Sequence, residues 1–354
     1  MAHEESRRKF IGSMATLGVA QMSPENVIAQ EAKAAASRRN RIDVHHHILP
    51  PEYVAKVGEK AIGAPAPNLE TPKWTVASSL NAMDENDIAT AVVSISAPGI
   101  WYNDAKLATY LARASNSFGA QMKSDHPGRF GSFASLPLPD VKASMEELKY
   151  SLDTLKCDGI SFMTNYGDRY LGDPEFAPIF DELNARGAIA YVHPTSCNCS
   201  LGVMSEIPAS MIEFPHDSTR TIVSLMYSGT FTRCPNIKFI FSHAGGTLPF
   251  LANRIALLGK LHHAFAERVP GGVMPLLQQL NFDTALSANN VAIPALLKIV
   301  SAKKVMLGTD FPFAPAMAMK GQIADLQKLN LPEQDLLDIE RGNAARLFKS
   351  FGAA

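Results

Sequence analysis

The chain has 354 residues, of which 46% are hydrophobic and 19% are charged, a composition typical of a soluble globular protein. Its 33 Lys and Arg residues nearly balance its 34 Asp and Glu residues, and no basic stretch interleaved with aromatic residues occurs. This balance excludes a broad nucleic-acid-binding surface. No run reaches the roughly 18 apolar residues that a membrane span needs. The four cysteines form no regular framework, which excludes a disulfide scaffold, and we interpret Cys197-Asn198-Cys199 as loop sequence rather than a metal-binding knuckle.

The N-terminal segment resembles an export signal. Arg7 and Arg8 precede a modest apolar run over residues 10–22, and Val27-Ile28-Ala29 offers small residues for cleavage. We therefore predict a twin-arginine signal peptide over residues 1–29, with a polar linker over residues 30–40, and a periplasmic or exported protein. The alternative is a merely basic N-terminus on a cytoplasmic protein.

From residue 41 onward, short apolar segments alternate with longer amphipathic ones. The segments that indicate strands are 41–48, 90–96, 131–138, 158–164, 188–193, 237–243, 280–285 and 304–310. The segments between them that indicate helices include 103–126, 141–156, 175–186, 217–232 and 247–260. Such alternation builds parallel βαβ units, and eight units predict a single (β/α)8 TIM barrel over residues 41–350. A doubly wound open sheet is the alternative, but the first strand is not followed by a GxGxxG turn.

Metal-competent side chains stand at four of these predicted strand ends. His45 and His47 are two residues apart on the first strand, so their side chains share a face and form a pair of potential metal ligands. His193, His243 and Asp310 end the fifth, sixth and eighth strands. In a barrel these ends gather on one rim, where catalytic groups lie.

The motifs around these residues resemble those of the amidohydrolase superfamily. They are DVHHHILP, YVHPT, FSHAGG, GTDFPF and the terminal stretch over residues 341–348. The closer likeness is to the branch of aminocarboxymuconate semialdehyde decarboxylase and the aromatic hydroxy-acid decarboxylases. This resemblance implies a metal-dependent, non-oxidative decarboxylase without an organic cofactor. It also implies that His45, His47, His193 and Asp310 bind the metal and that His243 is the catalytic base.

The predicted ligands suit one divalent ion per chain. Three imidazoles and one carboxylate favour zinc, with manganese as the alternative. In superfamily members with two metals, a lysine at the end of the fourth strand is carboxylated to bridge them. Here Lys156 precedes that strand instead. The sequence therefore predicts a mononuclear site.

Decarboxylation requires a proton on the carbon that loses the carboxylate. We expect Asp310 to relay this proton with His243 as its partner. Arg220 is a candidate clamp for the substrate carboxylate, although a surface ion pair with Asp217 or a subunit contact would explain it equally well. Asn165 and Trp101 are candidates for lining the substrate pocket, with a solvated loop and ordinary packing as their respective alternatives.

We thus expect a small aromatic hydroxy acid or unsaturated carboxylic acid as substrate, and a homodimer, since related decarboxylases are commonly dimers. Two other functions fit the same fold. The first is a mononuclear hydrolase of an amide, lactone or ester, in which the metal activates water. The second is a metal-binding protein without catalysis, which the additional presence of His243 disfavours.

Overall fold

The computed structural model describes residues 39–66, 70–200, 203–204 and 206–351, all of which belong to one compact unit. The predicted signal peptide over residues 1–29 and the linker up to residue 38 lie outside the described residues. Within the described part of the chain, every helix is too short or too polar to cross a bilayer.

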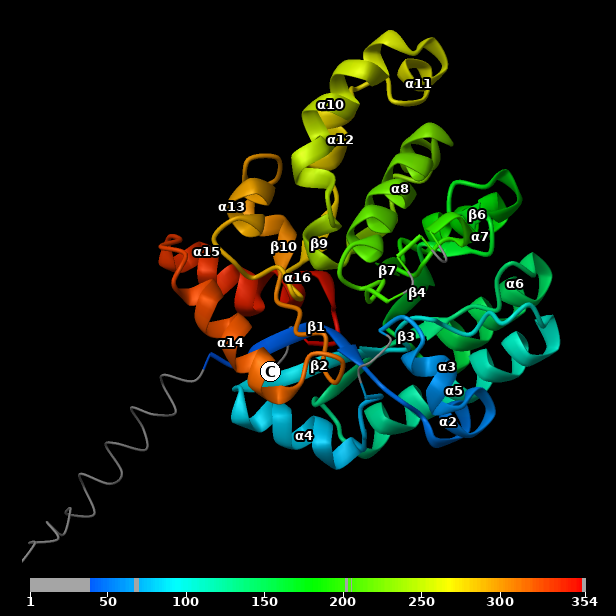
Figure 1. Ribbon diagram of the computed structural model, residues 1–354, viewed down its shortest axis with the longest axis vertical. Coiled ribbons are helices and arrows are strands. Elements are labelled where there is room, and N and C mark those ends of the chain that lie inside the picture. Colours follow the sequence, from blue (N-terminus) through cyan, green and yellow to red (C-terminus); the bar gives the residue numbers. More distant parts are fainter. Residues whose placement is uncertain (1–38, 67–69, 201–202, 205, 352–354) are drawn as a thin grey trace, which may run out of the picture. The chain divides into compact units, whose positions relative to one another are not determined.

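Eight parallel strands form one sheet that curves into a barrel (Figure 1). In order around the barrel they are β1 (Arg41–His47), β2 (Ile88–Ser94), β3 (Phe130–Ser135), β4 (Gly159–Met163), β7 (Ile189–His193), β8 (Lys238–Phe241), β9 (Asn281–Asp283) and β10 (Val305–Met306). The backbone N–H of Val44 donates to the carbonyl of Leu307 at 2.9 Å, which joins β1 to the segment after β10. The predicted (β/α)8 barrel is therefore confirmed.

Helices follow most strands and pack on the outside of the barrel (Figure 1). They are α2 (Pro51–Val57), α3 (Glu59–Gly63), α4 (Val76–Glu85), α5 (Ala105–Asp125), α6 (Val141–Lys149), α7 (Ala177–Arg186), α8 (Glu213–Tyr227), α9 (Thr230–Arg233), α10 (Leu248–Leu261), α11 (His263–Arg268), α12 (Val273–Leu277), α13 (Ala292–Leu297), α14 (Ala316–Gln327), α15 (Glu333–Leu337) and α16 (Asn343–Leu347). Acidic capping residues determine where two of these helices begin. Asp104 accepts hydrogen bonds from the first turn of α5, and Asp140 does so for α6. A short hairpin, β5 (Asn165–Tyr166) and β6 (Arg169–Tyr170), follows β4.

Apolar side chains fill both sides of the strands. Ile42, Val44, Tyr191, Ile240 and Met306 belong to one buried cluster that draws on six different strands. Two larger clusters join the other faces of the strands to the surrounding helices. The barrel is thus a packed core, which leaves the carboxyl ends of the strands as the place for a site.

An irregularity in β1 aims its histidines. The pairing of β1 with β2 loses its regular register between Asp43 and His46, as in a β-bulge. The histidines beyond it face different ways: His45 and His47 approach other strand ends inside the barrel, whereas His46 bonds to Asp43 and to Ser79 of α4. The bulge therefore lets one strand bury apolar residues and still present two imidazoles inside the barrel.

Candidate metal centre and active site

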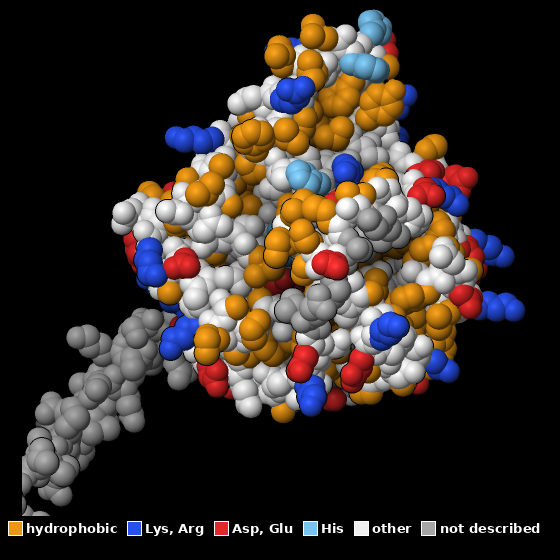
Figure 2. Space-filling view, in the orientation of Figure 1, with side chains coloured by type: hydrophobic (Ala, Val, Ile, Leu, Met, Phe, Trp, Pro, Cys, Tyr) orange, Lys and Arg blue, Asp and Glu red, His pale blue; other side chains and the backbone are white. Residues whose placement is uncertain are grey.

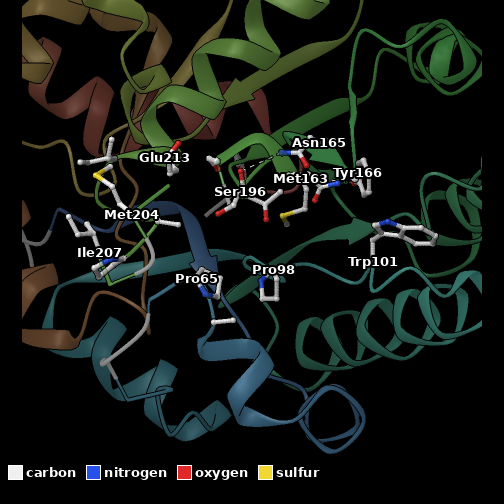
Figure 3. Close-up of a pocket in the computed structure, with 18 of the residues that line it drawn as sticks. Pro65, Pro98, Trp101, Met163, Asn165, Tyr166, Ser196, Met204, Ile207 and Glu213 are labelled. Carbon is white, nitrogen blue, oxygen red and sulfur yellow. Dashed lines mark hydrogen bonds between the residues drawn. The ribbon is translucent and has the colours of Figure 1, made fainter. Parts of the chain in front are cut away.

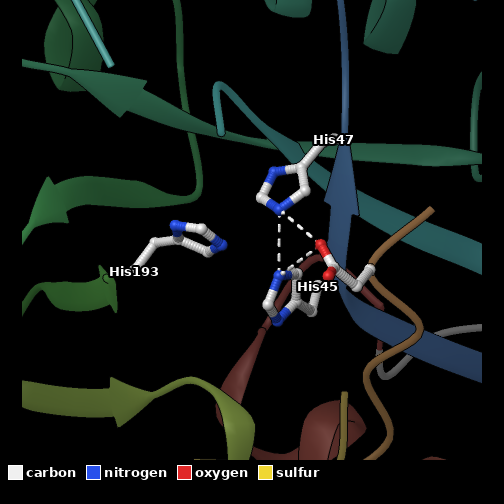
Figure 4. Close-up of side chains that lie close together, drawn as sticks. His45, His47 and His193 are labelled. Atoms are coloured by element: carbon white, nitrogen blue, oxygen red, sulfur yellow. Dashed lines mark hydrogen bonds and ion pairs between the residues drawn. The ribbon is translucent and has the colours of Figure 1, made fainter. Parts of the chain in front are cut away.

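The four predicted metal ligands converge at the carboxyl ends of the strands. His45 and His47 end β1, His193 ends β7, and Asp310 follows β10. One ligand atom from each of the four lies within 4.8 Å of the others. Figure 4 shows the rings of His45 and His47 turned toward the same carboxylate, with His193 beside them. The spacing matches a site for one small cation.

The individual distances show how tight this cluster is. The Nε2 atoms of His45 and His47 are 2.9 Å apart, and they lie 3.2 and 3.1 Å from Oδ1 of Asp310. The three histidines are at most 2% exposed and Asp310 is 6% exposed. Polar atoms so crowded and so buried need a common partner.

Each ligand histidine is held through its other ring nitrogen. Nδ1 of His45 lies 2.9 Å from Oδ2 of Asp283, and Nδ1 of His193 lies 2.8 Å from the carbonyl of Pro194. Nδ1 of His47 lies 3.2 Å from Oγ of Ser94. Because the carboxylate and carbonyl partners can only accept, Nδ1 of His45 and Nδ1 of His193 carry a proton, and the neutral form of each ring has its lone pair on Nε2.

The atoms that face the centre of the cluster also suit a cation, because they are acceptors. Oδ1 of Asp310 is buried and receives no hydrogen bond from the described residues. In the neutral form of His45 its Nε2, 3.2 Å from this oxygen, is an acceptor as well. An orphaned carboxylate oxygen facing several imidazole lone pairs is the donor set of a divalent ion. The residues present therefore fit the metal that the sequence predicts.

The pKa values of the cluster members are shifted in different directions by their surroundings. Burial would lower the pKa of His45, but the Asp283 and Asp310 carboxylates outweigh it and raise this pKa to about 10. Burial lowers the pKa of His47 to about 4, and burial among other imidazoles lowers that of His193 well below its ordinary value. Burial opposes ionisation of Asp310, yet the neighbouring imidazoles of His243 and His45 hold its pKa well below the usual range.

His243 stands at the edge of the metal cluster. Its Nε2 lies 3.7 Å from Oδ2 of Asp310, and its Nδ1 lies 3.1 Å from Oγ of Ser242. The side chain is 11% exposed, so it is the more accessible member of this pair. His243 and Asp310 both have left-handed backbones, with φ of 53° and 63°. Such strain in non-glycine residues is typical of functional sites.

A cavity of about 280 Å³ opens onto this cluster, and we call it the metal-side cavity. His193, His243 and Asp310 contribute to its wall. Much of the remaining surface is apolar, from Ile62, Pro65, Pro72, Ala97, Met211, Phe214, Pro215, Leu286 and Phe313. None of the described lining residues is Lys or Arg. The cavity therefore offers a small molecule a mainly apolar wall next to the metal cluster.

Two of the three candidate substrate residues line a neighbouring cavity. Trp101 and Asn165 belong to a space of about 320 Å³, the rim cavity, which shares Pro65 with the metal-side cavity (Figure 3). Arg220 lies elsewhere, in a hollow with Tyr170 and His216, and its side chain is 44% exposed. Its NH1 is 3.6 Å from Asp217, the ion pair considered as its alternative role.

The loop after β7 contains one bond that the sequence reasoning did not include. Cys197 lies in the loop and Cys199 in a single 3-10 turn within it, Asn198–Ser200, and the two cysteines form a disulfide that spans a single residue. A bridge between cysteines this close in the chain does not produce the regular cysteine spacing from which a disulfide is predicted. Ser196, Asn198 and Ser200, which alternate with the two cysteines, line the rim cavity.

Sequence reasoning also missed Asp283. Its side chain is fully buried beside His45, at the end of β9. The available signal was its position, because Asp283 falls within a predicted strand whose carboxyl end must join the catalytic rim.

Comparison with known proteins agrees with this geometry. Residues 42–349 match the model of a family described as amidohydrolase. Decarboxylase macB of Penicillium terrestre is 40% identical over 327 residues, which cover 88% of this chain and 96% of that protein. The 6-methylsalicylic acid decarboxylase of Penicillium expansum is 34% identical over 312 residues, covering 87% and 96%.

Solved structures share the fold. A crystal structure described as amidohydrolase II superposes with a TM-score of 0.80 at 28% identity, covering 87% of this chain and 99% of that one. The 5-carboxyvanillate decarboxylase of Novosphingobium aromaticivorans, solved with manganese and a nitrobenzoic acid, gives a TM-score of 0.75 at 20% identity, covering 87% and 96%. The motifs, the barrel and the family match lead to one conclusion: the chain belongs to the amidohydrolase family.

Proposed function

We propose that the protein is a metal-dependent, non-oxidative decarboxylase of a small aromatic hydroxy acid. One observation carries the proposal: His45, His47, His193 and Asp310 converge on one point, with His243 beside them, at the wall of a mainly apolar cavity. The names of the similar curated proteins, decarboxylases and 6-methylsalicylic acid decarboxylase among them, support it.

The size and lining of the metal-side cavity support a substrate with a single ring. Its volume of about 280 Å³ lies just below the range of roughly 300–1,000 Å³ for ligand pockets. Phe214 and Phe313 are the aromatic members of its wall, and Leu286 adds an aliphatic one. A planar ring packs well against such side chains. Because the described lining has no Lys or Arg, the polar end of the substrate is oriented at the metal cluster.

A bound divalent ion would act as a Lewis acid that polarises the phenolate or carboxylate oxygen of the substrate. The protein's own residues then manage the proton. Oδ2 of Asp310 and Nε2 of His243 are 3.7 Å apart, so a small shift lets the two side chains share a proton. This proton goes to the ring carbon that bears the carboxylate. A pair of ring π electrons forms the new carbon–hydrogen bond. The carbon–carbon bond then breaks, CO2 leaves, and the electron pair of the broken bond restores the aromatic ring.

We propose one ion per chain, with zinc favoured by the three imidazoles and manganese as the alternative. Among the described residues, one cluster of four potential metal ligands occurs, which is enough for one ion. The fourth strand ends in Met163, and Lys156 lies before it. A structurally similar decarboxylase was solved with manganese, which supports testing both metals.

The test is an assay of CO2 release on metal-depleted full-length protein reconstituted with zinc or manganese. We expect 6-methylsalicylate and related hydroxybenzoates to release one CO2 for each acid consumed, and the metal-depleted protein to be inactive. A dienoic acid serves as the comparison substrate. Metal binding without CO2 release from any acid, together with cleavage of a lactone or an ester, would replace this proposal with the hydrolase.

We also propose that the protein is a homodimer. Phe250, Leu257, Leu258 and Leu261 are between 48% and 88% exposed and recur at helical spacing along α10. Figure 2 shows hydrophobic side chains gathered over this part of the molecule. A stripe of this kind on a soluble protein favours a protein–protein contact. Light scattering after size-exclusion chromatography should show a dimer for the wild-type protein and a monomer for the L257E/L261E variant. A monomeric wild-type protein would contradict the proposal.

Export through the twin-arginine route is a further proposal, with a cytoplasmic location as its alternative. It rests on Arg7 and Arg8 before the apolar run. The Cys197–Cys199 disulfide supports it, because disulfides persist mainly in oxidising compartments. Fractionation of cells that express the R7K/R8K variant should show the protein retained in the cytoplasm, and an unchanged distribution would contradict export.

A further inference from the structure

The carboxylate of Asp283 touches two different parts of the active site. Oδ2 lies 2.9 Å from Nδ1 of His45, a metal ligand. Oδ1 accepts a hydrogen bond of 2.9 Å from the backbone N–H of His243. Asp283 is not itself among the donor atoms that converge on the metal position. Any effect of Asp283 on the metal position is therefore transmitted through the two histidines.

The contact with His45 decides which ring nitrogen carries the proton. A carboxylate only accepts, so Nδ1 of His45 must donate to it. Nε2 is then left with its lone pair, and this is the atom that lies 2.9 Å from Nε2 of His47 in the cluster. Carboxylates that fix a ligand histidine in this way make it a better ligand.

The contact with His243 holds a strained piece of backbone. His243 and Ala244 both have positive φ, at 53° and 55°. Oδ1 of Asp283 accepts from the N–H of His243 and also from the N–H of Ala285, at 3.0 Å. The strained turn after β8 is thereby tied to the end of β9, which sets where the imidazole of His243 stands.

The packing around Asp283 leaves this arrangement little freedom. The side chain is fully buried, and Tyr191 donates a further hydrogen bond of 3.3 Å to Oδ2. At Gly308, an added Cβ would lie 3.0 Å from the Asp283 carboxyl carbon and 2.8 Å from Cβ of His45. The absence of a side chain at Gly308 thus allows the carboxylate and the imidazole to sit together.

We propose that Asp283 is a positioning residue that prepares His45 to bind the metal and fixes the backbone of His243. Its effect on metal affinity is independent of the substrate, whereas its effect on turnover rests on the proposed decarboxylase function.

An asparagine at this position cannot serve both histidines. If the amide nitrogen faces His45, two N–H donors meet, and His45 must move its proton to Nε2. If the amide oxygen faces His45, the amide nitrogen meets the N–H groups of His243 and Ala285. Asp283→Asn is thus nearly isosteric and disrupts one side or the other.

The experiment measures metal affinity of the full-length protein by calorimetry, with zinc and manganese as probes. We expect Asp283→Asn to weaken binding by about 10–100-fold. Tyr191→Phe is the matched control, because it removes another donor to the same Oδ2 and leaves His45 in place; it should change affinity by less than about 3-fold. At saturating metal, Asp283→Asn should lower kcat by about 10-fold while KM changes little.

Circular dichroism and thermal melting of the metal-free proteins show whether the variant folds. A second measurement needs no variant: nitrogen NMR of the histidine rings in the metal-bound wild type should show His45 protonated at Nδ1. Wild-type affinity in Asp283→Asn, or a His45 protonated at Nε2, would overturn the inference. Weakened affinity in a protein that releases no CO2 would support the role of Asp283 and refute the decarboxylase.

Discussion

The two ends of β1 carry buried polar clusters that differ in the groups surrounding their carboxylate: arginine side chains at the start and imidazole rings at the end. At its start, Arg41 donates to Oε1 of Glu340 at 2.9 Å and to the carbonyl of Asn86 at 3.0 Å. Gln327 donates to the same Glu340 oxygen, and Arg39 lies 3.5 Å from the other one. At the end of β1, His45 and His47 crowd against Asp310, whose Oδ1 receives no hydrogen bond from the described residues.

This difference separates a structural cluster from a functional one. Oε2 of Glu340 also receives no hydrogen bond from the described residues, but the guanidinium groups of Arg41 and Arg39 balance the charge of this carboxylate without a ligand. Asp310 instead shares a small volume with imidazole lone pairs, which repel one another unless a cation or a proton joins them. Buried charge alone therefore does not mark a site, whereas convergent acceptors do.

Replacing Asp310 should have the largest effect, because it removes the carboxylate at the centre of the cluster. We expect Asp310→Ala to lower turnover by at least about 10³-fold and to reduce metal content. Asp310→Asn should retain some metal while losing proton transfer. Elemental analysis and CO2 release measure the two effects, and full activity in either variant would exclude this role for Asp310.

Replacing His243 should separate chemistry from metal binding. His243→Asn removes the imidazole beside Asp310 but none of the four convergent donors. We expect turnover to fall by about 10²–10³-fold, with metal affinity within a few-fold of wild type. Steady-state kinetics at saturating metal provide the measurement. A variant that loses its metal instead would place His243 among the ligands.

Changes in the cluster at the start of β1 should lower stability and leave metal binding and turnover unchanged. Arg41→Met leaves the buried Glu340 with fewer partners, and we expect the free energy of unfolding to fall by about 3 kcal/mol. Metal affinity and kcat should stay at their wild-type values below the unfolding transition. Urea unfolding and calorimetry test this. Loss of metal affinity without loss of stability would contradict the separation of the two clusters.

The smallest expected effect concerns protons. The pKa of His45 is raised to about 10 in the metal-free protein, since Asp283 and Asp310 outweigh the opposing effect of burial. Below this pKa the metal-free site therefore holds a proton that the metal must displace. Affinity should rise up to about 10-fold per pH unit between pH 7 and 9, with release of about one proton. Calorimetry in buffers of different ionisation enthalpy measures this number, and a value near zero would show His45 to be neutral.

Much of the fold and the metal site was predictable because both follow from local pattern. Each of the eight predicted strands overlaps an observed one. Parallel strands in a barrel end on a common rim, so His193 and Asp310 could be grouped with the β1 histidines without knowledge of any contact. The shortness of β10 was not predictable: the segment after it still bonds to β1, but irregularly, and Asp310 has a φ of 63°.

The remaining parts depend on contacts between distant segments. Asp283 and His45 are 238 residues apart, and only the barrel's closure brings them together. Arg220 lies at a helix position that sequence alone leaves open, and the structure places it beside Asp217 rather than in the metal-side cavity. Whether Asn165 and Trp101 contact substrate depends on how the two cavities are used, and their role stays a prediction.

The most direct test of the account is titration of metal-depleted full-length protein with zinc or manganese while CO2 release from a hydroxybenzoate is followed. We predict that activity rises with added metal and stops at about one equivalent per chain, with one CO2 released for each acid consumed. Activity in the fully depleted protein, or a failure of the protein to bind either metal, would contradict the central claim.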